Sequence, residues 1–235
     1  CALVCACLGA QAGVSVVDDS GATVRLAQPA QRIVTLAPHM AETVFAAGAG
    51  EKLVGAVEYS DYPAAARKVR RVGGYSRLDL EIITALKPDL IIAWQSGNAP
   101  AHIEKLRALG FPVYVSQPER IEDVASEIER IGQLAGSSRV ADPLAAKLRQ
   151  RLADLRKNYS ERSPVRTFYQ IWKQPLVTIG GQQIISSVIR LCGGENVFAR
   201  LETLAPTVTL EAVIVAYPEV IIASGMDEAR PEWLD

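Results

Sequence analysis

The chain has 235 residues, enough for one large domain or for two lobes of about 100 residues each. Its hydrophobic content of 49% is sufficient for buried cores, and its formal net charge of -1 argues against a nucleic-acid-binding surface. No apolar run reaches about 18 residues, which argues against a membrane-spanning helix.

Residues 1–12 differ from the rest of the chain because they are apolar, rich in small residues and contain three of the four cysteines. They end in Ala-Gln-Ala, which is typical of the end of a secretory signal peptide with cleavage after Ala12. A buried first strand and a lipoprotein acylated at Cys7 are the alternatives, but the residue pattern fits both less well. We therefore expect an exported protein in which Cys192 is the remaining cysteine.

Strands and helices alternate along most of the chain, which predicts an α/β fold with mainly parallel sheets. Residues 14–28 alternate around Asp-Ser-Gly and predict a β-hairpin. The first half then predicts strands at 33–37, 53–57, 90–94 and 112–116, with helices at about 40–48, 79–86 and 99–109. The second half predicts strands at 167–171 and 219–224, with helices at about 183–192 and 209–216.

Residues 121–163, between these halves, predict helices without strands. Apolar residues recur at helical spacing from Val140 to Tyr159. Asp142-Pro143 suits an N-cap and first helical position, so the long helix begins there or at Ser138 with a kink at the proline. A single helix is a stiff connector, and we expect no large hinge closure.

An internal repeat predicts two similar lobes. Leu80–Trp94 returns as Leu210–Ser224, 130 positions later, with a helix, a proline followed by an acid, and an apolar strand. We expect an N-terminal lobe at 13–120, linking helices at 121–163 and a C-terminal lobe at 164–235, with a ligand cleft between the lobes. The first lobe continues beyond Trp94 for one more helix and strand, so the symmetry predicts that the second lobe is truncated at its C-terminal end.

Aromatic side chains follow the expected strands at the ends where parallel sheets bind ligands. Tyr59 follows strand 53–57, Trp94 closes strand 90–94, Trp172 follows strand 167–171, and Tyr75 lies in the loop after the second strand. Each aromatic alone could serve packing, but together they favour an aromatic-lined cleft.

The polar residues near these strand ends, including Asn98, are mostly neutral or acidic. A site for a strongly anionic ligand normally contains several arginines, so this one suits a large, roughly neutral, amphipathic ligand. His39 follows strand 33–37 by two residues. It is either a polar residue at a helix start or close enough to the ligand to hydrogen-bond or coordinate it, and the second is our hypothesis. An imidazole titrates near pH 6.5 when unbound, so affinity is expected to fall as the pH drops through 6.

Other functional classes have less support in the sequence. No glycine-rich phosphate loop follows the first strand, and no Ser-His-acid or His/Cys cluster is visible, which argues against an enzyme. A metal-ion carrier would need several convergent histidines and carboxylates, whereas the chain has two histidines.

Three stretches resemble the vitamin B12-binding proteins of bacterial ABC importers: Tyr59-Ser-Asp-Tyr-Pro63, Leu86–Trp94 followed by Gly97-Asn98-Ala99, and Cys192–Phe198. From about Val14 onward the chain also resembles the wider class that binds iron-siderophores, haem and cobalamin. The resemblance implies a rigid monomer of two lobes joined by one helix, with a corrinoid between the lobes as cargo and no cofactor or metal of its own. It places Tyr59, Tyr75 and Trp94 at ring-contacting positions.

Two departures from the B12-binding pattern keep a haem- or siderophore-binding protein open as the alternative. His39 stands where the pattern has a small residue. The second-lobe tryptophan of the pattern falls at Ala205, while Trp172 is added nearby.

Glu81 and Glu211 occupy the same place in the repeat, each two residues after an expected N-cap, Asp79 and Thr209. An acid in the first helical turn stabilises the helix dipole by about 0.3–1 kcal/mol. The resemblance adds a second role for both acids, which is docking to the membrane permease of an ABC importer.

Overall fold

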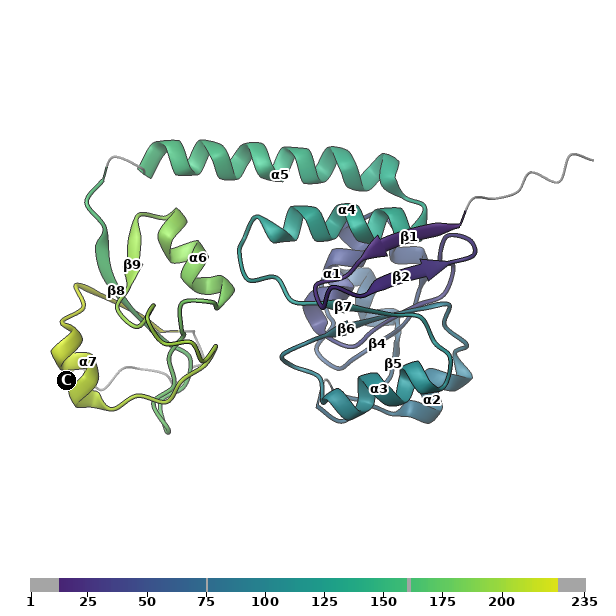
Figure 1. Ribbon diagram of the computed structural model, residues 1–235, viewed down its shortest axis with the longest axis horizontal. Coiled ribbons are helices and arrows are strands. Elements are labelled where there is room, and N and C mark those ends of the chain that lie inside the picture. The colour runs from purple at the N-terminus through teal and green to yellow at the C-terminus, as the bar shows by residue number, and fades with distance from the viewer. Residues whose placement is uncertain (1–12, 75, 160–161, 224–235) are drawn as a thin grey trace, which may run out of the picture. The chain divides into compact units, whose positions relative to one another are not determined.

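The computed structural model describes residues 13–74, 76–159 and 162–223 (Figure 1). These residues form two compact units. Unit 1 contains the described residues up to Gln117 together with Ser126–Ala145, and unit 2 contains Pro118–Ala125 and the described residues from Ala146 onward. The expected signal peptide at 1–12, Tyr75, and the end of the repeat from Ser224 lie outside the described residues.

Unit 1 is built on a five-stranded parallel sheet with the order β5-β4-β3-β6-β7. Its strands are β3 (Ile33–Thr35), β4 (Leu53–Ala56), β5 (Arg70–Arg71), β6 (Leu90–Trp94) and β7 (Val113–Ser116). Its helices are α1 (Pro38–Ala46), α2 (Leu80–Ala85), α3 (Pro100–Ala108) and most of α4 (Asp123–Ala135), with short 3-10 helices at Gly50–Lys52 and Ala64–Lys68. The two-residue strand β5 was not predicted.

Helices cover both faces of this sheet, which explains its continuous apolar strands. Figure 1 shows α2 and α3 on one side of the sheet and α4 on the opposite side. All four residues from Leu90 to Ala93 are fully buried. An uninterrupted apolar strand is expected in a parallel sheet, because neither of its faces is left to solvent.

The predicted N-terminal hairpin forms from β1 (Val14–Val17) and β2 (Thr23–Leu26), which pair antiparallel. The two aspartates of its turn fix it to the end of β7. Oδ2 of buried Asp18 accepts a hydrogen bond of 3.1 Å from the backbone N–H of Val115, and Oδ2 of Asp19 accepts one of 2.6 Å from that of Gln117. The turn sequence therefore serves attachment of the hairpin as well as chain reversal.

Unit 2 repeats the plan on a smaller scale, with a three-stranded parallel sheet in the order β10-β8-β9. The strands are β8 (Val165–Gln170), β9 (Gly194–Asn196) and β10 (Val220–Ala223), and the helices are α6 (Ile184–Leu191) and α7 (Leu210–Ala216). The predicted fold class, α/β with mainly parallel sheets, is confirmed.

One helix of 22 residues, α5 (Ser138–Tyr159), continues from unit 1 into unit 2. It begins at Ser138, the earlier of the two predicted starts, with Pro143 inside it. None of the helices in the described ranges combines the length and apolar character that crossing a membrane requires.

In unit 1, the side chains of Arg32 and Asp89 join the end of a helix to the starts of two strands. Arg32 lies just before β3, and its Nε and Nη2 atoms donate hydrogen bonds of 2.9 and 2.7 Å to the carbonyl of Leu86, at the C-terminal end of α2. Asp89, just before β6, accepts hydrogen bonds of 2.8 Å from the backbone N–H groups of Gln31 and Arg32. The helix end and the two strand starts are thus joined by charged side chains.

The second copy uses the same interactions in unit 2. Nε of Arg166 donates to the carbonyl of Tyr217 over 3.1 Å, and Nη2 of Arg166 donates to that of Ala216, at the C-terminal end of α7. Glu219 accepts a hydrogen bond of 2.9 Å from the backbone N–H of Arg166. Tyr217 and its counterpart Lys87 share a left-handed backbone, with φ of 46° and 45°.

We expect Arg32→Ala to lower the free energy of unfolding by about 1–2 kcal/mol, because the carbonyl of Leu86 at the end of α2 loses its charged donor. Urea unfolding followed by circular dichroism measures this loss. Arg25→Ala, at an exposed position on β2, is the control and should leave the free energy of unfolding within about 0.5 kcal/mol of the parent value. Equal stability of the two variants would show that the Arg32 interaction contributes nothing.

Candidate functional site

The strand order of unit 1 creates one position where ligand binding is favoured. From β3 the chain adds β4 and β5 on one side of the sheet, then returns to place β6 and β7 on the other. The connections leaving β3 and β6 therefore diverge at the carboxyl ends of these neighbouring strands. Such topological switch points are the usual ligand-binding positions of open parallel sheets.

His39 and Trp94 meet at this switch point. His39 lies in the first turn of α1, which follows β3, and Trp94 is the last residue of β6. Their ring centroids are 5.1 Å apart and their planes are at 88°, an edge-to-face arrangement. The sequence placed both residues at strand ends, and the structure brings them into contact.

Burial changes the acid-base behaviour of His39. Desolvation lowers the pKa of the imidazole from 6.5 to about 4, because the charged form is disfavoured away from water. The ring is therefore neutral at neutral pH, with one nitrogen available as an acceptor or metal ligand. The expectation that affinity falls as the pH drops through 6 used the pKa of a free imidazole and did not include this desolvation.

Two neighbours fix the position of Trp94. A Cβ on Gly97 would lie 1.8 Å from Cε3 of the indole, so only glycine allows the chain to pass so close to this ring. Asn98 is 3% exposed. Its Oδ1 accepts a hydrogen bond of 2.7 Å from the backbone N–H of Trp94, and its Nδ2 donates one of 2.9 Å to the carbonyl of Leu36.

The expected contact between Asn98 and the ligand stays a prediction, and the structure adds a structural role for this side chain. Its amide is buried and joins the end of β6 to the segment after β3. The sequence did not show this role, because Leu36 and Asn98 are distant along the chain.

Tyr59 is presented on the loop after β4, the neighbour of β3 on its other side. Its side chain is 79% exposed and its φ is 64°, a left-handed backbone that is unusual for a bulky residue. Nη2 of Arg71 donates a hydrogen bond of 2.8 Å to the carbonyl of Ser60, which fixes the following residue. An exposed aromatic ring held on a constrained backbone is consistent with a ligand contact.

Trp172 lies in unit 2, two residues after the end of β8. Its indole is 50% exposed, and its Nε1–H donates a hydrogen bond of 3.0 Å to the carbonyl of Gln174. The ring is therefore held in one orientation with half of its surface accessible.

Glu81 and Glu211 are exposed in the first turns of α2 and α7. The predicted N-caps form in both helices: Asp79 accepts from the N–H of Ile82 over 2.9 Å, and Thr209 from that of Ala212 over 3.2 Å. The pKa of Glu211 is lowered by hydrogen bonds to its carboxylate from its own backbone N–H and from the Thr209 hydroxyl. The two acids thus have equivalent settings within their own units.

Within residues 13–74, 76–159 and 162–223, no three histidine, cysteine or acidic side chains come together as a metal site. The arrangement at the switch point consists of aromatic rings and a neutral imidazole. Its chemistry is stacking, hydrogen bonding and donation of a nitrogen lone pair.

Two relatives are similar to this chain over most of its length. The chain is 44% identical to a vitamin B12-binding protein of Vibrio cholerae serotype O1 over 196 residues, which cover 83% of this chain and 71% of that protein. It is 40% identical to a vitamin B12-binding protein of Yersinia pestis over 212 residues, covering 88% of this chain and 76% of that protein.

Solved structures share the fold. The crystal structure of the periplasmic vitamin B12-binding protein of Vibrio cholerae matches with a TM-score of 0.79 at 44% identity, over 83% of this chain and 77% of that chain. A periplasmic haem-binding protein from Roseiflexus sp. RS-1 matches with a TM-score of 0.73 at 25% identity, over 82% of this chain and 76% of that chain. Residues 33–235 match the family model described as periplasmic binding protein, and the chain therefore belongs to the periplasmic binding protein family.

Proposed function

We propose that this protein binds cobalamin or a related corrinoid in the periplasm and delivers it to the permease of an ABC importer. The observation that carries the choice of ligand is the 44% identity to a vitamin B12-binding protein over 83% of the chain. The corrinoid is cargo, and we propose that the protein acts on it as a carrier and not as an enzyme.

The geometry at the switch point supports a large, flat, amphipathic ligand. Trp94 and Tyr59 supply aromatic surface, and His39 supplies a neutral nitrogen beside Trp94. We propose that these three residues contact the corrin ring, with Tyr75 and Trp172 as further contacts. Aromatic groups give such contacts a large buried area with little loss of side-chain entropy.

Haem is the second candidate ligand, and one observation favours it. A neutral imidazole at the switch point is a suitable axial ligand for haem iron. The haem-binding protein from Roseiflexus sp. RS-1 has a TM-score of 0.73 at 25% identity. The lower identity ranks haem below cobalamin.

We propose that Glu81 and Glu211 dock the carrier to the permease, which would present basic pockets to them. Both carboxylates are exposed at helix N-termini, where they also favour the helix dipole. We further propose that the carrier is a monomer in solution.

We expect Trp94→Ala to weaken cobalamin binding by about 1–3 kcal/mol, because the variant lacks the indole surface that would contact the corrin ring. Isothermal titration calorimetry measures the change. Trp94→Phe keeps a ring and should retain more of the affinity, while Val215→Ala, at a site 83% exposed on α7, is the control and should retain all of it. Unchanged affinity in Trp94→Ala would assign the indole to packing against Gly97 alone.

The lowered pKa of His39 predicts the pH below which acid weakens cobalamin binding. Because neutral imidazole persists down to about pH 4, its ionisation should leave cobalamin affinity unchanged from pH 8 to about 5. Affinity should fall as the pH approaches 4, since protonation introduces a buried charge and removes the lone pair. Calorimetry across this range on the parent and His39→Gln measures the effect, which the variant should lack.

A visible-spectrum shift on binding, lost in His39→Gln, would identify coordination of the ligand's metal as the reason for the acid effect. Identical pH profiles and identical bound spectra in the parent and the variant would contradict any contact between His39 and the ligand.

Reversing both proposed docking charges separates transport from binding. We expect Glu81→Lys with Glu211→Lys to abolish corrinoid uptake while cobalamin affinity stays unchanged, because the charges meet the permease and not the ligand. Uptake by cells and calorimetry on the purified variant give the two readouts. Glu104→Lys with Glu202→Lys reverses two other exposed acids, one in each unit, and should leave uptake intact. Loss of cobalamin binding in the first variant would contradict the docking role.

A further inference from the structure

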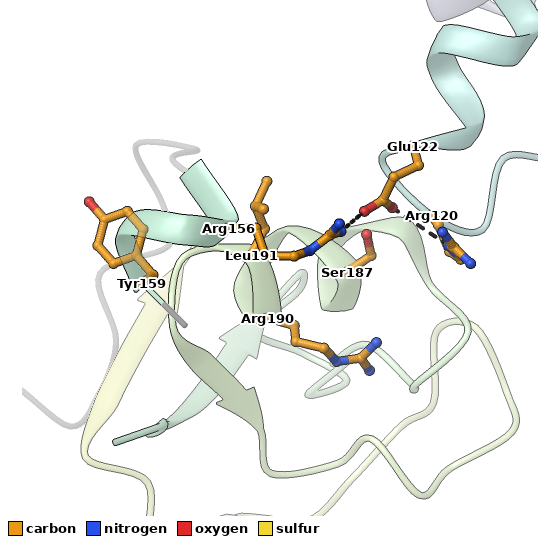
Figure 2. A pocket seen from close by; sticks show the side chains of 7 residues that line it. All are labelled: Arg120, Glu122, Arg156, Tyr159, Ser187, Arg190 and Leu191. Atoms are coloured by element: carbon orange, nitrogen blue, oxygen red, sulfur yellow. Dashed lines mark hydrogen bonds and ion pairs between the residues drawn. The ribbon is translucent and has the colours of Figure 1, made fainter. Parts of the chain in front are cut away.

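Unit 2 contains a cavity of about 370 Å³ whose lining is mainly cationic (Figure 2). Arg120 precedes α4, Arg156 lies near the end of α5, and Arg190 lies on α6. Among the described residues that line the cavity, Glu122 is the one acid. Three arginines from separate segments and one carboxylate thus line the cavity, so its described lining has an excess of positive charge.

The carboxylate of Glu122 is engaged by two of these arginines. Arg156 donates a hydrogen bond to its Oε1, and Nε of Arg120 lies 3.5 Å from its Oε2, as the dashed lines in Figure 2 show. Partial burial acts to raise the pKa of Glu122. Hydrogen bonds from its own backbone and from Arg156, with the charges of Arg156 and Arg120, outweigh the burial and lower it. Glu122 is thus ionised at neutral pH and held in place.

Arg190 differs from the other two arginines. Figure 2 shows its guanidinium apart from the Glu122 cluster, and within the described part of the chain it has no hydrogen bond or ion pair. A further cation lies close by, since the guanidinium carbon of Arg162 is 4.8 Å from the ring centroid of Tyr159, another lining residue. One carboxylate cannot neutralise these groups, and a bound anion would relieve their mutual repulsion.

The remaining lining residues complete a binding site of mixed character. Oγ of Ser187 accepts a hydrogen bond of 2.9 Å from the backbone N–H of Ile121, so its hydroxyl hydrogen is available to donate into the cavity. Leu191 and the ring of Tyr159 supply apolar surface. A ligand that matches this lining carries an anionic group for the arginines and a small apolar group for these two side chains.

We propose that this cavity binds a phosphate monoester with a small apolar substituent. Guanidinium forks match phosphate oxygens in pairs, and a hydroxyl donor complements them. The site uses residues other than those proposed to contact the corrinoid, so the two proposals can be tested separately.

Phenyl phosphate is the probe, because it combines the phosphate group with an apolar ring. It is titrated into the ligand-free protein in phosphate-free buffer of low ionic strength, where exposed charges are least screened. Chemical-shift changes in nitrogen-15 NMR spectra follow the titration. The expected result is saturable binding, with shifts centred on residues 120–122 and 187–191 and weaker binding of inorganic phosphate. Absence of saturation, or equal affinities for the two anions, would overturn the proposal.

Arg190→Gln tests the residue on which the proposal depends. It should weaken phenyl phosphate binding about tenfold, as expected for loss of a charged hydrogen-bond donor. Arg200→Gln removes another exposed arginine of unit 2 and should change nothing. Equal binding by the Arg190 variant and the parent would overturn the site. Cobalamin affinity of the Arg190 variant is measured in parallel and should equal that of the parent. Failure of the phosphate site can therefore be distinguished from failure of the proposed cobalamin binding.

Discussion

The hydrogen bonds from an arginine to the end of a helix, combined with an acid on the start of a strand, organise both units of this protein. In unit 1, Arg32 caps α2 while Asp89 holds the backbone of Arg32. Because both residues stand at strand starts, they fix β3 beside β6, with Ile33 opposite Leu90. Unit 2 repeats the arrangement with Arg166 and Glu219, which pair β8 with β10. The proline-acid motif of the sequence repeat is therefore a device for aligning two parallel strands.

The register that is set at the starts of β3 and β6 also fixes the relative positions of their carboxyl ends, where the candidate site lies. With β3 and β6 in register, Leu36 and Trp94 come close enough for the amide of Asn98 to join them. His39 then meets Trp94 edge to face, and burial keeps its imidazole neutral. The chemistry at the switch point thus follows from charged interactions at the opposite ends of the same strands, through a sheet whose buried core leaves little freedom to deform.

Local sequence patterns predicted the parts of this structure that depend on local physics. The buried strand Leu90–Trp94 and the N-caps Asp79 and Thr209 can each be predicted from a few consecutive residues, and the repeat from a comparison of two such stretches. The resemblance to vitamin B12-binding proteins is confirmed by the comparisons. The burial of Asn98, the lowered pKa of His39 and the convergence of Arg120, Arg156 and Arg190 could not be predicted. They depend on segments more than thirty residues apart, which only the tertiary fold brings together.

The two candidate binding regions differ in the physical basis of their selectivity. At the switch point the contacts that we propose are aromatic rings and a neutral imidazole, so the proposed selectivity depends on ring contacts and on the lone pair of His39, on which salt has little effect. In the cavity of unit 2 the guanidinium groups are largely exposed, with Arg120 and Arg156 side chains 65% and 60% accessible, so attraction for an anion weakens as ionic strength rises. Salt therefore distinguishes them: a contact that persists at high ionic strength belongs to the aromatic region, and one that disappears belongs to the arginines.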